Sequence, residues 1–178
     1  ANVQALADGQ QVTDVFTYTN SDNHGGVSSS TLTVTVTGTN DASVAVADLA
    51  AVKEDTPPNP VSGNLLANDP DVDSNDTHTV SAVTGGSDNG TTITTVGTYG
   101  TLVITKATGA YTYTLANGQA NVQALVDGQQ VTDAFTYTNS DNQGGSSSST
   151  LTVTVTGTDN APVAVADVAA VKEDTPPN

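Results

Sequence analysis

The residues best suited to chemistry in this sequence are aspartates and asparagines, and they are densest between residues 68 and 76. This run reads Asn-Asp-Pro-Asp-Val-Asp-Ser-Asn-Asp and supplies four carboxylates, from Asp69, Asp71, Asp73 and Asp76. Ca²⁺ takes about six to eight oxygen ligands at about 2.3–2.6 Å, which spaced Asp and Asn side chains in a loop can provide. We therefore predict a Ca²⁺ site in this loop, with a solvated Asp- and Asn-rich turn as the alternative.

Other metals suit this loop less well. Zn²⁺ prefers Cys and His ligands, and the chain has no Cys and only two His. Mg²⁺ demands stricter octahedral geometry than a run of flexible side chains offers. An EF-hand is excluded because the run lacks the central Gly, the terminal Glu and the flanking helices of that motif.

Further oxygen ligands lie in three other short groups. One is Asn40-Asp41, which returns in reversed order as Asp159-Asn160. Another is Glu54-Asp55, and the third is Asp141, which follows a strand rich in aromatic residues and corresponds to Asp22 earlier in the chain. The complete predicted ligand set is Asn40, Asp41, Glu54, Asp55, Asp69, Asp71, Asp73, Asp76, Asp141, Asp159 and Asn160.

These groups recur because the chain repeats itself. Residues 1–59 return at 120–178 with a constant offset of 119 and eight differences. A period of this length suits one small domain per repeat rather than a solenoid. We predict that residues 1–41 are the last strands of one repeat, residues 42–160 a complete repeat, and residues 161–178 the first strand of the next.

Alternating patterns indicate strands. Leu151, Val153 and Val155 alternate with threonines, and Phe135 points to the same side as Tyr137. Pairs such as Asn-Gly and Asp-Gly separate these stretches. Only residues 121–125 are predicted to form a helical turn. The pattern predicts an all-β fold, an immunoglobulin-like antiparallel β-sandwich repeated in tandem.

One pair of differences between the copies suggests compensation. Ala7 becomes Val126 while Val15 becomes Ala134, so that total side-chain volume is conserved. We predict that these two positions are neighbours beneath the helical turn.

The composition excludes several classes of function. The formal net charge is −16, with three lysines and no arginine, so nucleic acids and anionic membranes would be repelled. No stretch reaches the roughly 20 apolar residues that span a bilayer. Without Cys there can be no disulfide, and bound metal is then the available cross-link for a small secreted domain.

Catalysis has little support. His24 is replaced by Gln143 in the second copy, so no chemistry shared by the repeats depends on it. The serine runs have no positioned His and acid partner. We predict that the chain is not an enzyme.

Several motifs resemble known repeats. Asp159-Asn160-Ala161-Pro162, together with Asp71-Val72-Asp73, Glu54 and Asp141, resembles the calcium motifs of cadherin repeats. The run from Val61 to Asp69, and the strands at residues 97–102, 110–113 and 152–158, resemble VCBS repeats of large bacterial RTX-type adhesins. This resemblance implies a cadherin-like sandwich that is exported by type I secretion to the bacterial surface.

The resemblance also implies how the ligands would be shared. Glu54, Asp159 and Asn160 would lie at the lower end of the complete domain. Asp71, Asp73 and Asp141 would lie at its upper end and meet Asn40 and Asp41 from the domain before.

The expected function is a Ca²⁺-stabilised spacer of a secreted adhesin, which projects a distal binding domain. Its partners would be neighbouring repeats, with host or biofilm ligands bound through other domains. Two alternatives remain: a filament subunit assembled by strand addition between chains, and a glycan-binding module.

Overall fold

The computed structural model describes residues 3–73, 75–171 and 173. Two short helices and eleven strands occur in this part of the chain. In order they are η1 (Val3–Ala5), β1 (Gln11–Ser21), β2 (Val27–Thr37), β3 (Asp48–Lys53), β4 (Val61–Asn64), β5 (Thr79–Val83), β6 (Ser87–Asp88), β7 (Thr92–Val96), β8 (Gly100–Thr105), β9 (Ala110–Leu115), α1 (Ala120–Gln123), β10 (Gln130–Ser140) and β11 (Ser146–Thr156).

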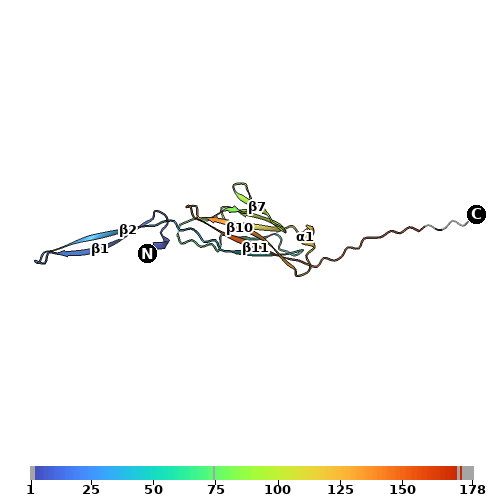
Figure 1. Ribbon diagram of the computed structural model, residues 1–178, viewed down its shortest axis with the longest axis horizontal. Coiled ribbons are helices and arrows are strands. Elements are labelled where there is room, and N and C mark those ends of the chain that lie inside the picture. The colour runs from blue at the N-terminus through green and yellow to red at the C-terminus, as the bar shows by residue number, and fades with distance from the viewer. Residues whose placement is uncertain (1–2, 74, 172, 174–178) are drawn as a thin grey trace, which may run out of the picture.

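Strands β3 to β11 form a two-layer sandwich (Figure 1). One sheet has the order β3-β11-β10-β5 and the other β4-β9-β8-β7-β6. One cluster of buried apolar side chains, drawn from both sheets, fills the space between them; it includes Ile93, Leu102, Tyr113, Phe135 and Val153. The predicted all-β sandwich is confirmed. All strand pairs are antiparallel except β3 with β11, which run parallel.

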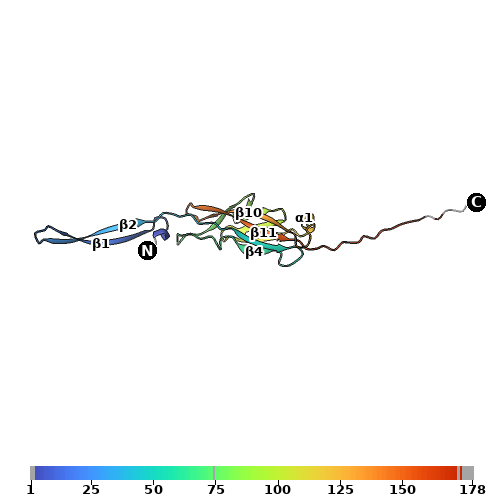
Figure 2. The same cartoon turned by 60° about the horizontal axis from the view of Figure 1, so that its bottom comes forward.

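Strands β1 and β2 form a separate hairpin that extends beyond one end of the sandwich, while residues 161–171 leave at the other end (Figures 1 and 2). Strands β1 and β2 pair in the same register as β10 and β11: Phe16 opposes Leu32, and Phe135 opposes Leu151. Burial differs completely. Phe16 is 54% exposed and Phe135 only 4%, because only the second hairpin has a facing sheet.

The predicted helical turn is present as α1, over Ala120–Gln123 rather than 121–125. It is not the only one, because the first copy of the same sequence forms the short helix η1. Helix α1 places Val122 and the following Leu125 in the core. The proposed volume compensation is wrong, because Val126 is 66% exposed and Ala134 is also exposed. Exposed side chains of this kind have no shared cavity to fill.

The segment 38–47 joins the hairpin to the sandwich and packs against the sandwich at defined positions. Ser43 is buried, and the Val44 N–H donates to the Pro70 carbonyl oxygen at 2.9 Å. Residues 161–171, which repeat residues 42–52, are exposed throughout. The division of the chain into repeats at residues 41 and 160 stays a prediction. Within the described residues, no helix has the length and apolar character needed to cross a membrane.

The two hairpins allow a matched test of core packing. Phe135→Ala should destabilise the sandwich by about 3–5 kcal/mol, because it opens a cavity between the sheets. Phe16→Ala, the same change in the same local sequence, should shift sandwich stability by less than about 0.5 kcal/mol. Urea unfolding followed by circular dichroism measures both; equal losses would contradict the assignment of the core.

Candidate metal centre

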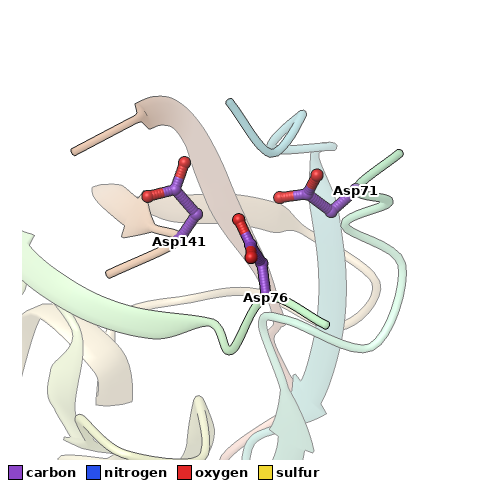
Figure 3. Close-up of side chains that lie close together, drawn as sticks. All are labelled: Asp71, Asp76 and Asp141. Atoms are coloured by element: carbon purple, nitrogen blue, oxygen red, sulfur yellow. The ribbon is translucent and has the colours of Figure 1, made fainter. Parts of the chain in front are cut away.

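Two loops converge at the end of the sandwich nearest the first hairpin (Figure 1). The loop between β4 and β5 carries Asp71 and Asp76, and the turn between β10 and β11 carries Asp141. One carboxylate oxygen from each lies within 4.8 Å of the others. Figure 3 shows these side chains pointing toward a common space. Residues 65 positions apart in the chain are thus brought together only by the fold.

The linker before the sandwich docks onto the same cluster. The Asn40 Nδ2 donates to Asp141 Oδ2 at 3.0 Å, and the Asp41 backbone N–H donates to Asp73 Oδ2 at 2.7 Å. The Asp73 N–H in turn donates to Asp71 Oδ1 at 2.9 Å. Six of the eleven predicted ligands therefore lie in one connected group: Asn40, Asp41, Asp71, Asp73, Asp76 and Asp141.

Several oxygens of this group are buried and accept no hydrogen bond from the described residues. They are Asn40 Oδ1, Asp71 Oδ2, Asp73 Oδ1 and Asp76 Oδ2. Burying an unpaired carboxylate oxygen is costly, and native proteins satisfy nearly all such atoms. An all-oxygen set of carboxylates and one amide has the chemistry that Ca²⁺ prefers. The cluster therefore fits a hard divalent cation.

Protein cations supply little compensation here. His78 Nε2 lies 3.3 Å from Asp71 Oδ2, and it contributes a positive charge only when protonated. Lys53 and Lys106 pair elsewhere, with Asp127 and Asp88. Among the described residues, then, the carboxylates of the cluster outnumber the basic groups beside them.

The pKa values reflect this crowding. Burial, followed by repulsion from Asp73, Asp71 and Asp141, raises the pKa of Asp76. For Asp141, burial alone would raise the pKa, but hydrogen bonds from Asn40 and from backbone N–H groups outweigh it, so that its pKa lies below the usual value. Hydrogen-bond donors thus stabilise the anionic form of Asp141, whereas the carboxyl group of Asp76 is harder to ionise.

The turn that holds Asp141 is local in origin. The backbone N–H groups of Gln143 and Gly145 donate to Asp141 Oδ1 at 2.8 and 2.9 Å. The first copy repeats this: the N–H groups of His24 and Gly26 donate to Asp22 Oδ1 at the same distances. Asp22 is exposed, whereas Asp141 is completely buried. The sequence thus shapes the turn, and the neighbouring loops make it part of a site.

Asp69 is placed differently from its neighbours in the loop. Its Oδ1 accepts from the Val46 N–H at 2.8 Å and its Oδ2 from Asn139 Nδ2 at 3.0 Å. The Tyr137 hydroxyl lies between Asp69 and Asp48, 2.9 Å from Asp48 Oδ2. Burial is the main cause that raises the pKa of Asp48. Asp69 therefore connects the linker to β10, and both of its carboxylate oxygens accept hydrogen bonds from the protein.

The remaining predicted ligands lie at the opposite end. Glu54 is completely buried, and its carboxylate accepts from Gln123 Nε2 at 2.9 Å and from Asn160 Nδ2 at 3.2 Å. Asp55 exchanges hydrogen bonds with Asn117. Asp159 is exposed. Sequence reasoning missed Gln123 and Asn117, which carry no charge and hence gave no signal.

Gly145 offers a test of the docked linker. A Cβ there would overlap Asp141 Oδ2 and come within 2.8 Å of Ala42 Cα. Gly145→Ala should therefore displace the linker and lower sandwich stability by about 1–3 kcal/mol. Gly26→Ala, where the three atoms nearest to the added Cβ all belong to the Asp22 side chain, should leave sandwich stability nearly unchanged. Thermal unfolding of both variants is the measurement, and equal losses would contradict the docking.

The chain matches one protein family and is similar to solved cadherin structures. The family described as "Bacterial cadherin-like domain" matches residues 40–157. The structure of mouse clustered PcdhgC3 EC1–3 is similar with 17% identity and a TM-score of 0.43, covering 84% of this chain and 44% of that one. Protocadherin gamma B2 extracellular cadherin domains 3–6 are similar with 14% identity and a TM-score of 0.41, covering 82% and 32%.

This chain therefore aligns with less than half the length of either protocadherin structure. No curated protein was found to match. The family match extends over most of the chain and includes the whole sandwich. The chain belongs to the bacterial cadherin-like domain family.

Proposed function

We propose that the chain is a Ca²⁺-stabilised extender of a secreted bacterial adhesin, in which bound cation stiffens the joint between one domain and the next. One observation carries this proposal: buried oxygens without donors come from both the linker and the sandwich. A cation bound there would touch both sides of the joint. Asn40 belongs to the linker, whereas Asp71, Asp73 and Asp76 belong to the sandwich.

The charge of the site supports the same function. Without a cation, Asp71, Asp76 and Asp141 repel one another, which destabilises the loops that carry them. A divalent cation neutralises this repulsion and supplies the missing partner for each orphaned oxygen. The free energy of cation binding then stabilises the docked linker, and the angle between hairpin and sandwich is restricted.

The setting follows from this role. An extender of the RTX type acts at the bacterial surface after type I secretion, contacts neighbouring repeats, and leaves host or biofilm ligands to other domains. Its net charge of −16 disfavours nucleic acid and anionic membranes as partners. No catalytic step is part of the proposal.

Cation dependence is the direct test. Adding Ca²⁺ at about 100 times its dissociation constant should stabilise the chain by about 2.7 kcal/mol relative to EGTA. Asp76→Asn should reduce this gain and also raise stability in EGTA, because it removes repulsion from the cluster. Asp22→Asn, in the exposed copy of the Asp141 turn, should leave both values unchanged. A melting temperature that is the same in Ca²⁺ and EGTA would contradict the function.

A second function, assembly by strand addition between chains, is favoured by a separate observation. The apolar face of the first hairpin is uncovered, and residues 161–171 repeat the segment that pairs with β11 in the sandwich. The repeat offset predicts the register: Asp167 beside Leu32 and Val171 beside Val36, in parallel. A second copy of the chain could supply either strand.

Proline substitutions distinguish this alternative. The Glu54 N–H donates to the Thr156 carbonyl oxygen, so alternate N–H groups along β3, including that of Ala50, face β11. Ala169→Pro removes the corresponding donor and should abolish self-association. Ala170→Pro changes an outward N–H and should be tolerated. Analytical ultracentrifugation measures both; a monomeric parent chain, or equal effects of the two variants, would exclude strand addition.

A further inference from the structure

The two linkers of the chain differ in one informative way. Both contain Gly-Thr, then one acid and one amide, then Ala. In the first linker the amide precedes the acid, as Asn40-Asp41. In the second the acid precedes the amide, as Asp159-Asn160. We call residues 40 and 159 the first position of each linker, and residues 41 and 160 the second. The two linkers carry the same acid and amide at these positions, in opposite order.

The first position faces the sandwich that follows it. Asn40 Nδ2 donates to Asp141 Oδ2 at 3.0 Å, and Asp141 is completely buried. The same amide leaves Oδ1 buried without a donor, beside the cluster of carboxylates. Asn40 can thus hold Asp141 through its nitrogen while its oxygen stays available to a cation.

The second position faces the sandwich that precedes it. Asn160 Nδ2 donates to Glu54 Oε1 at 3.2 Å and to the Gln123 carbonyl oxygen at 3.1 Å. Thr158 strengthens this contact: its N–H donates to Glu54 Oε2 at 3.2 Å and its hydroxyl to the Glu54 carbonyl oxygen at 2.7 Å. The second linker is therefore tied to the buried Glu54 by neutral donors alone.

An acid at either contact would have the opposite effect. An amide nitrogen donates to a buried carboxylate and needs no ion, and hydrogen bonds to charged groups are among the stronger ones. A carboxylate in the same place would face another carboxylate, which is unfavourable unless a cation lies between them. The order of acid and amide then decides which neighbour a linker keeps when cation is withdrawn.

We propose that Asn40 and Asn160 are cation-independent latches, which hold the first linker to the following sandwich and the second linker to the preceding one. The acid of each linker, Asp41 or Asp159, makes the contact that requires a cation. When Ca²⁺ is removed, the first linker therefore stays on the following sandwich and loses its contact with the preceding one. The second linker stays on the preceding sandwich and loses its contact with the following one. The cation-dependent half of this proposal rests on the proposed function; the latch itself does not.

Hydrogen exchange at two backbone amides tests the latches in the full chain. The Thr158 N–H reports on the second linker and the Asp41 N–H on the first, since each donates to a carboxylate of its sandwich. In EGTA both should be protected in the parent chain. Asn160→Asp should accelerate exchange about tenfold or more at Thr158 only, and Asn40→Asp at Asp41 only.

Asp159→Asn is the matched control. It removes a charge next to Asn160 at an exposed side chain, and both amides should stay protected. The amide of Val153, inside the core strand β11, reports whether each variant remains folded. If Asn160→Asp unfolds, Asn160→Ala removes the donor without adding charge and should show the same selective loss.

The outcomes separate the latch from the proposed function. Loss of both protections in the parent chain in EGTA, or unchanged exchange in Asn160→Asp, overturns the latch. Restoration of the Asp41 protection by Ca²⁺ in Asn40→Asp supports both proposals, because this amide donates to Asp73 within the carboxylate cluster. If the selective losses occur in EGTA and Ca²⁺ does not restore the Asp41 protection, the latch stands and the cation-dependent function fails.

Discussion

Repulsion among the carboxylates of Asp71, Asp76 and Asp141 is the constraint on which the joint depends. The fold gathers these groups at one end of the sandwich and adds Asp73 and the linker amide of Asn40. Four of the oxygens there are buried without a donor. Such an arrangement is costly by itself, and in the function proposed above a bound cation offsets this cost and links stability to the position of the linker.

The two ends of the sandwich manage buried negative charge by different means. At the far end, Glu54 is surrounded by neutral donors from Gln123, Thr158 and Asn160. At the near end the carboxylates face one another and, among the described residues, only Asp141 accepts from several donors. One end is therefore closed by hydrogen bonds, while the other retains free oxygen ligands. The two ends of the repeat are therefore chemically different.

Much of the candidate site could be predicted from residue types and spacing. The run at residues 68–76 placed Asp71, Asp73 and Asp76 in one loop, and the repeat drew attention to Asn40, Asp41 and Asp141. Asp69 shows the limit of this reasoning. It lies two residues from Asp71, yet it accepts hydrogen bonds from Val46 and Asn139. Spacing along a loop indicates which carboxylates are close, whereas the direction of each side chain depends on the donors that the rest of the fold supplies.

The near-identical hairpins separate local from tertiary causes. Alternation and turn residues determine that β1–β2 and β10–β11 pair in the same register, and that Asp22 and Asp141 accept the same backbone hydrogen bonds. Burial is not determined in this way: Leu32 is 55% exposed and Leu151 is completely buried. A strand pattern encodes which face is apolar, because side chains alternate along it. Only a second sheet packed against that face removes it from water, and only the tertiary structure supplies that sheet.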